Sequence, residues 1–177
     1  MIETHDGGLP ADEDISIARV EGDIALCRSP VSLTLIAYWR DLAARRDGRP
    51  RWRDVRLMDL YKIAHHLVVK DLIDGGRDYV NRFWGSSVTE GLGFDGTRKR
   101  VSEYDPSRMR RSVQRRYHRL VSMAEPAMVR GYITTLPEHD HLPFELVHLP
   151  LWNDDGDAVR HIISAYHFGF VASEDGV

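Results

Sequence analysis

The stretch that most constrains the fold is Leu67–Gly85, in which two apolar-rich runs flank a short polar segment. The runs are Leu67–Ile73 and Tyr79–Trp84, and the segment between them is Asp74-Gly75-Gly76-Arg77. Glycine adopts positive φ without steric cost, so two glycines between strand-like runs predict a β-hairpin with a short loop. The chain is therefore expected to build a sheet with at least one antiparallel pair of consecutive strands.

Composition limits the class of protein. A chain of 177 residues with 42% hydrophobic and 29% charged residues is typical of one globular domain with its own core. The net charge of −3 gives no general attraction to nucleic acid or to an anionic membrane. No apolar run approaches the roughly 20 residues that a membrane span needs.

The N-terminus and the cysteine content suggest a compartment. The first residues lack the basic and apolar regions of a signal peptide. A single cysteine, Cys27, cannot form an internal disulfide, which suits a reducing environment. We therefore expect a cytoplasmic protein.

The chain divides into two tails and one domain. Residues 1–28 are polar at first and then mixed, and we expect an N-terminal tail that is partly disordered. Residues 29–171 are expected to form a single domain, and residues 172–177 a C-terminal tail.

A leading helix is predicted over residues 30–46. Ser29 supplies an N-cap hydroxyl, and Pro30 suits the first helical position. The apolar surface of this helix is wider than a helix lying on one sheet needs, which leaves two interpretations. The helix is either well buried in its own domain, or it also packs on a second subunit and makes the chain a homodimer. The residues expected on the dimer face are Leu35, Tyr38, Trp39 and Leu42.

The rest of the chain predicts the remaining elements. A short helix begins near residue 86, a glycine-rich winding segment follows over residues 91–105, and a longer helix covers residues 107–123. Strand-like runs then cover residues 127–135, 144–152 and 158–171. This order predicts an α+β fold with a five-stranded antiparallel sheet, helices on one face and an N-terminal flanking helix.

The order of elements is that of PAS domains, and a series of short motifs resembles one bacterial group of them. The resemblance covers roughly residues 32–170. The motifs, in chain order, are Tyr38-Trp39, Gly48-Arg49-Pro50 with Asp54-Val55, Asp71-Leu72-Ile73-Asp74-Gly75-Gly76, Arg82 with Gly85-Ser86, Gly93 and Asp95 with Val101-Ser102-Glu103, and Leu149-Pro150-Leu151 with Asp154-Asp155-Gly156. The sequence departs from the group at Asn81, where a tyrosine is usual, at Leu57 for a proline and at Arg98 for a glycine.

The resemblance implies a PAS-like fold with a cavity between the sheet and the short helices. It implies a stand-alone sensory or regulatory domain that acts in signal transduction through small-ligand perception, protein–protein interaction or both. An unidentified signalling protein is then an expected partner. The alternative is a small enzyme or carrier that uses the cavity for an apolar metabolite. No Gly-x-Ser-x-Gly, phosphate-binding loop or HExxH motif is present, so we expect no enzyme.

Polar and aromatic residues on the predicted strands are candidate ligand contacts, because a half-buried sheet can point them into a cavity. The alternative is that some face solvent or a neighbouring subunit, since side chains alternate along a strand. The predicted pocket residues are Asn81, Phe83, Tyr132, His148, Tyr166 and Phe168.

Some PAS domains hold haem through a histidine on the helix that here covers residues 107–123. A helical wheel places His118 opposite the apolar stripe of this helix, so we do not expect haem, and the cofactor stays open. Arg116 falls inside the stripe and should either extend its charge outward or reach an anionic group. The other arginines spread around the polar arc, so no nucleic-acid partner is expected.

Two histidine-containing segments have the residue types of a metal site. The segment Glu138-His139-Asp140-His141 lies in a predicted turn, and His65-His66 at a predicted helix end. Their spacing does not supply a tetrahedral ligand set, so we expect no metal.

Overall fold

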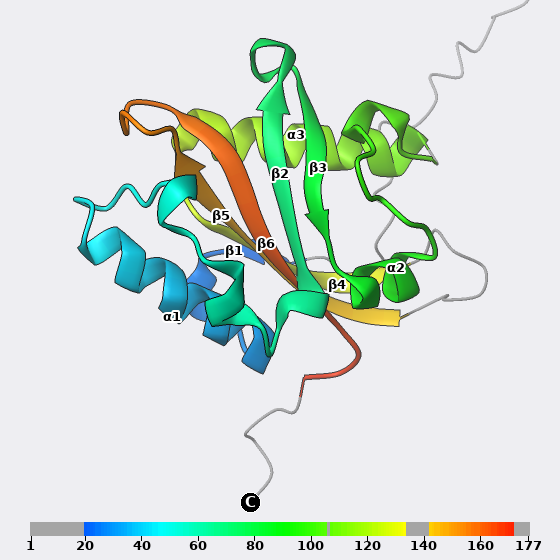
Figure 1. Ribbon diagram of the computed structural model, residues 1–177. Helices are drawn as coiled ribbons and strands as arrows, with labels where there is room; N and C mark the ends of the chain where they lie inside the picture. Colours follow the sequence, from blue (N-terminus) through cyan, green and yellow to red (C-terminus); the bar gives the residue numbers. More distant parts are fainter. Residues whose placement is uncertain (1–19, 106, 134–141, 172–177) are drawn as a thin grey trace, which may run out of the picture.

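The computed structural model describes residues 20–105, 107–133 and 142–171, which form a six-stranded antiparallel sheet with helices on both faces (Figure 1). The strands lie in the order β1-β4-β5-β6-β2-β3, so the first hairpin pairs with the last strand. The strands are β1 (Val20–Gly22), β2 (Leu67–Ile73), β3 (Asp78–Trp84), β4 (Ala127–Ile133), β5 (Leu142–Trp152) and β6 (Val159–Phe168).

The α+β class and the antiparallel sheet are confirmed, but the strand count of five is wrong. The sixth strand, β1, lies in the stretch that we assigned to the N-terminal tail. It pairs with β4 through Val20 opposite Arg130 and Gly22 opposite Met128. Three residues are too few for the alternation of apolar and polar side chains to be visible in the sequence.

Three α-helices surround the sheet, joined by short 3₁₀ turns. The helices are α1 (Pro30–Ala44), α2 (Ser86–Leu92) and α3 (Ser107–Met123). The 3₁₀ turns are η1 (Ile24–Leu26), η2 (Trp52–Asp54), η3 (Leu57–Leu60), η4 (Ala64–His66), η5 (Asp74–Gly76) and η6 (Val101–Glu103). The Ser29 hydroxyl accepts the Ser32 N–H at 3.1 Å, so α1 begins where its sequence predicts.

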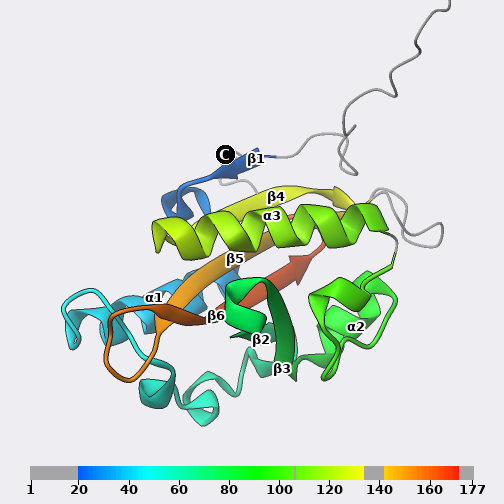
Figure 2. The same cartoon turned by 90° about the horizontal axis from the view of Figure 1, so that it is seen from above.

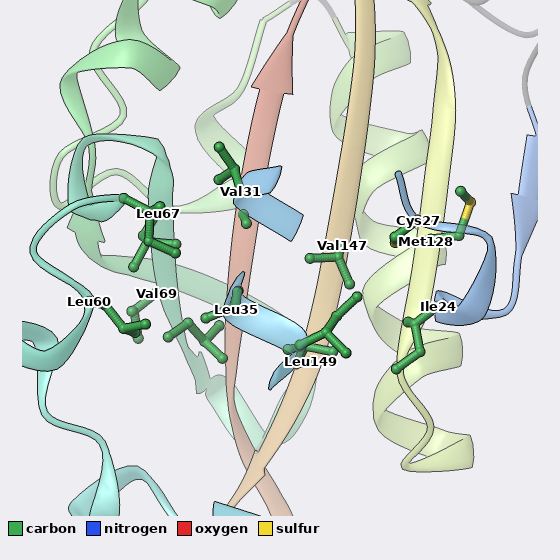
Figure 3. Close-up of a cluster of buried hydrophobic side chains, with 14 of the residues drawn as sticks. Ile24, Cys27, Val31, Leu35, Leu60, Leu67, Val69, Met128, Val147 and Leu149 are labelled. Carbon is green, nitrogen blue, oxygen red and sulfur yellow. The ribbon is translucent and has the colours of Figure 1, made fainter. Parts of the chain in front are cut away.

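One face of the sheet carries the main core, against α1. Leu35 of α1 is fully buried and packs with Val147 and Leu149 of β5 and Val69 of β2. Figure 3 shows these side chains together with Met128 from β4. The burial of this apolar surface holds α1 on the sheet.

The opposite face lies against α3. Tyr117 and Leu120 of α3 pack with Tyr79 of β3 and Ile162 of β6, whereas the next residue, Ile163, belongs to the core under α1. Figures 1 and 2 show α1 and α3 on different sides of the sheet. Val88 of α2 packs on this same face, so α2 and α3 share one face and the N-terminal helix α1 flanks the other. Both faces can be covered because side chains alternate along β5 and β6 and both faces of these central strands are apolar.

The predicted hairpin is confirmed as β2–β3. Its loop is closed by positive φ at Asp74, Gly75 and Gly76. The register of the pair shifts between Val69 and Lys70, so that Lys70 stands opposite Asn81. This irregularity sets the geometry of the site described next.

Candidate functional site

A lysine lies at the centre of the sheet face that α3 covers. Lys70 is 1% exposed and follows the buried apolar residues Leu67, Val68 and Val69 in β2. Its Nζ donates a hydrogen bond to Asn81 Oδ1 at 2.7 Å. A fully buried lysine is rare, because the charged amine loses its hydration and needs a partner to offset the loss.

Asn81 connects this amine to the segment that follows α2. Its Nδ2 donates to the Gly96 carbonyl at 2.6 Å and lies 2.8 Å from the Tyr104 hydroxyl. Its backbone N–H donates to the Lys99 carbonyl at 3.0 Å. Asn81 therefore contacts the amine, a phenol and the Gly96 carbonyl through its side chain, and the Lys99 carbonyl through its backbone.

Three aromatic rings surround the amine. Lys70 Nζ lies 5.2 Å from the ring centroid of Trp84, 5.4 Å from that of Tyr117 and 5.8 Å from that of Tyr104. These distances are within the range of a cation–π contact. We call Lys70, Asn81, Trp84, Tyr104 and Tyr117 the Lys70 centre.

Burial changes the protonation of the Lys70 centre. It lowers the pKa of Lys70 from its usual 10.5 to about 7, and no acidic group among the described residues acts in the opposite direction. Burial also raises the pKa of Tyr104 and of Tyr117 above the ordinary range. Near neutral pH the centre thus holds a half-neutral amine among un-ionised phenols.

Two more tyrosines adjoin the centre. The hydroxyls of Tyr117 and Tyr166 lie 3.4 Å apart, and burial raises the pKa of Tyr166. The Tyr79 ring lies 5.2 Å from that of Tyr117, and its buried hydroxyl has no hydrogen-bond partner within the described part of the chain. Burial, helped by Asp78, raises the pKa of Tyr79 to about 12.

Four of the six predicted pocket residues lie on the α3-covered face. Asn81 belongs to the Lys70 centre, and Tyr166 contacts it through Tyr117. His148 Nδ1 lies 2.7 Å from Ser164 Oγ, and the His148 ring is 5.1 Å from that of Tyr117. Phe168 lies next to Tyr166, with a ring distance of 6.2 Å.

The other two predicted pocket residues lie apart from this group. Phe83 packs against the core that α1 covers. Tyr132 of β4 lines a surface cleft of about 200 Å³ together with Arg130 and Phe144. Alternation along each strand explains the separation, and the sequence alone did not fix which set of residues faces α3.

The residues predicted for a dimer face pack within the chain. Leu35 and Leu42 are buried, and Tyr38 and Trp39 are half-buried against the core. Trp39 Nε1 donates to the Pro150 carbonyl at 2.8 Å, and the Tyr38 hydroxyl accepts the Arg56 N–H at 2.8 Å. A homodimer stays a prediction, and these side chains already have partners in their own chain.

Other sequence candidates have clear positions. His118 is exposed, as the helical wheel predicts. Arg116 is mostly buried and reaches an anionic group, with its Nε 3.4 Å from Glu21 Oε1 of β1. The segment at residues 138–141 lies outside the described residues.

The described residues contain no group of three or more His, Cys, Asp or Glu side chains placed to hold a metal. Within residues 20–105, 107–133 and 142–171, no helix is long and apolar enough to cross a membrane.

A second hollow lies between the C-terminal half of α1 and η2–η3. It measures about 690 Å³ and is lined by several arginines and aspartates, Tyr38 and Leu42. The Arg46 guanidinium pairs with Asp54 at 2.7 Å, and Arg45 pairs with Asp41 at 3.1 Å. These internal pairs offset much of the local charge, so the cleft is a weaker candidate site than the Lys70 centre.

Sequence reasoning missed Lys70, Trp84, Tyr104 and Tyr117 as site residues. The available signal was a lysine within the predicted strand Leu67–Ile73, directly after three apolar residues. No protein-family model matches the chain, and a search of curated proteins also finds no match.

Proposed function

We propose that this chain is a PAS-type sensory or regulatory domain that perceives a small ligand at the Lys70 centre. The carrying observation is the buried Lys70 amine, which has no acidic partner in the described chain. A buried amine without a counter-charge destabilises the fold. Local groups that lower stability are commonly retained at functional sites.

The arrangement of the sheet supports the PAS part of the proposal. The order of strands, with the first hairpin beside the last strand, is compatible with a PAS domain. The Lys70 centre lies between the sheet and the elements η6 and α3, and the resemblance implies a ligand space between the sheet and the short helices, of which η6 is one. The short strand β1 is an addition to the five strands that the resemblance implies.

The link through Asn81 offers a route for a signal. Ligand contact with the amine would alter the Lys70–Asn81 hydrogen bond, and Asn81 also binds the backbone at Gly96 and Lys99. Lys99 is exposed, so a change there reaches the surface of the protein. A protein partner that binds this surface would read the state of the site.

The test is a search for a bound ligand in protein purified from its natural host without denaturation. Native mass spectrometry should reveal an added small mass that wild type carries and that Lys70→Met carries less of. The matched control is Lys62→Met, which removes an exposed lysine. Wild-type protein that carries no added mass and binds no member of a metabolite library would contradict the ligand-sensing proposal.

The lowered pKa of Lys70 favours one alternative function. An amine with a pKa of about 7 is suited to act as a general base, so a small enzyme or carrier at the same site is the second candidate. Chemical turnover of a recovered ligand, lost in Lys70→Met, would favour the enzyme. Binding without turnover favours the sensor.

A further inference from the structure

The hydrogen-bonding groups of the Lys70 centre are out of balance, with many donors and few acceptors. A protonated lysine has three N–H donors, and the described residues give Lys70 one acceptor, Asn81 Oδ1. The same oxygen also lies 3.1 Å from the Tyr104 hydroxyl. A second acceptor, the Gly96 carbonyl, is taken by Asn81 Nδ2.

Tyr79 adds a further donor on the same face of β3. It is two residues before Asn81, so both side chains point toward α3. The Tyr79 side chain is 2% exposed, and its hydroxyl lacks a partner among the described residues. A buried hydroxyl without a hydrogen bond lowers stability, and it is satisfied if a ligand supplies an acceptor.

The Lys70 centre also lacks, among the described residues, a negative charge to balance the protonated amine. The carboxylate of Asp78 is close enough to this cluster to help raise the pKa of Tyr79. This carboxylate is occupied, because it accepts the Ser102 hydroxyl at 2.7 Å, the Ser102 N–H at 3.2 Å and the Tyr79 N–H at 2.8 Å. Among the described residues, the other ionisable groups at or beside the centre include Tyr104 after η6, Tyr117 and Arg116 on α3, Tyr166 on β6 and His148 on β5, and none of these supplies a negative charge near neutral pH.

Apolar rings form the rest of the surroundings. Trp84, Tyr104 and Tyr117 face the amine, and Phe94 packs on Trp84 and Tyr104 at ring distances of 5.4 and 5.2 Å. Aromatic walls with one polar anchor are typical of sites for small organic molecules. The polar anchor here is the Lys70 amine, whose positive charge when protonated favours an anionic ligand.

We propose that the Lys70 centre binds a small monocarboxylic acid with an aromatic or apolar body, whose carboxylate accepts hydrogen bonds from Lys70 and Tyr79. This inference rests on the proposed function and names the class of ligand at the same site. The body of the acid lies among the rings of the centre, and the segment from Gly93 to Arg100 moves to admit it. That segment is held to β3 by the two hydrogen bonds of Asn81 to Gly96 and Lys99.

Binding of such an acid changes the protonation of Lys70. In the ligand-free protein at pH 8 the amine is mostly neutral, since its pKa is about 7. A carboxylate beside it favours the charged form and raises the pKa of Lys70. Complex formation at pH 8 therefore takes up close to one proton from the buffer, whereas binding of a neutral molecule takes up none.

The experiment compares two acids with two alcohols of matched shape. Benzoate and 2-naphthoate are titrated into the full-length protein beside benzyl alcohol and 2-naphthalenemethanol, by calorimetry at pH 8 in two buffers of different ionisation enthalpy. We expect at least one acid to bind tenfold or more tightly than its alcohol, with an uptake close to one proton. The preference should disappear in Lys70→Met and persist in Lys62→Met, each checked for folding by circular dichroism.

Three results would overturn the inference. An alcohol that binds as tightly as its acid shows that the charge of Lys70 is not used, and this leaves the proposed function standing. Acid binding that Lys70→Met retains places the anion elsewhere. If neither acid binds at millimolar concentration, this ligand class fails, while the ligand recovered by native mass spectrometry still decides the proposed function.

Discussion

Lys70 Nζ and Asn81 Oδ1 lie 2.7 Å apart inside the interface between the sheet and α3. The register shift between Val69 and Lys70 sets these two residues opposite each other on β2 and β3. Asn81 is also one of the positions at which the sequence departs from the pattern of the proposed PAS resemblance, which expects a tyrosine there. The Asn81 side-chain amide accepts a hydrogen bond from the Lys70 amine and also donates one to the Gly96 carbonyl.

Replacing Lys70 by methionine should stabilise the protein, and the gain should depend on pH. The pKa of Lys70 is lowered from 10.5 to about 7 in the folded protein. Between these pH values the unfolded chain holds a proton that the folded protein lacks, so wild-type stability rises with pH. Below pH 7 both states are protonated, and the penalty of burial is complete.

Urea unfolding of wild type and Lys70→Met from pH 6 to pH 9 checks this prediction. The advantage of the variant should be largest near pH 6 and should shrink above pH 7, by up to about 1.4 kcal/mol per pH unit. Parallel stability profiles of the two proteins would show that the amine is hydrated or paired in solution.

Tyr79→Phe should stabilise the ligand-free protein while weakening acid binding. Its hydroxyl is buried without a hydrogen bond within the described chain, and removing such a group relieves a penalty of about 1 kcal/mol or more. Thermal unfolding and the benzoate titration are the two measurements. Tyr61→Phe, at an exposed tyrosine, is the control and should change neither. A loss of stability in Tyr79→Phe would mean that the hydroxyl has a partner in solution.

Glu145→Gln should destabilise the attachment of α1 to the sheet. Glu145 is fully buried on β5 and accepts hydrogen bonds from the Arg28 and Ser29 N–H groups, and its Oε2 lies 2.7 Å from the Arg130 guanidinium. Burial alone would raise the pKa of Glu145, but the hydrogen bonds from Arg130, Ser29 and Arg28 outweigh it and lower the pKa. We expect a loss of roughly 2 to 4 kcal/mol at pH 7, because the variant leaves Arg130 without its charge partner.

The pH dependence of the Glu145→Gln effect follows from the same shift. A carboxylate with a lowered pKa stabilises the fold above about pH 4.3 and loses this contribution as the pH falls through its folded pKa. The difference between wild type and Glu145→Gln should therefore shrink below pH 4. Glu125→Gln is the control at an exposed glutamate and should stay within about 0.5 kcal/mol of wild type.

Substitutions at two leucines of α1 distinguish an effect on the stability of the fold from an effect on the proposed dimer. Leu35 is fully buried, so Leu35→Ala should cost roughly 2 to 5 kcal/mol of stability through the cavity that it leaves. Leu33 is 48% exposed, so Leu33→Asp should leave the fold intact and weaken any dimer that uses the outer side of α1. Light scattering at several protein concentrations is the measurement. Wild type that is monomeric throughout would contradict the homodimer proposal.

The sequence predicted most elements because their local signals agree with their tertiary environment. The cap Ser29 with Pro30 marks the start of α1, and the glycines at 75 and 76 mark the β2–β3 turn. The stripe of α3 correctly placed His118 in solvent, and it left two alternatives for Arg116, of which the structure has the contact with an acid, Glu21. In each case a single residue, or the helical spacing of apolar residues, is enough to predict the local structure.

The errors have a common cause in long-range packing. The strand β1 has three residues and exists through its pairing with β4, more than 100 positions away in the sequence. The side of the sheet that α1 covers is likewise set by long-range packing, and no local period encodes it. Both faces of β5 and β6 are apolar near their centres, and this was the available hint.

The site was predicted only in part for the same reason. Four predicted pocket residues share the sheet face toward α3: Asn81, His148, Tyr166 and Phe168. The same reasoning from strand alternation also selected Phe83 and Tyr132, which lie apart from this face. Lys70 was overlooked because a lysine in a strand usually faces solvent. Its burial depends on the register shift in the hairpin and on aromatic residues from three separate elements.

The most direct test of the Lys70 centre is the titration of the Lys70 amine itself. Carbon-13 labelling of lysine Cε lets NMR follow this group in the ligand-free protein from pH 5 to pH 11, with Lys70→Met to assign its signal. The structure predicts a midpoint near pH 7, well below those of the exposed lysines. A midpoint near the usual 10.5 would contradict a buried amine without a counter-charge, and with it the site from which the function is proposed.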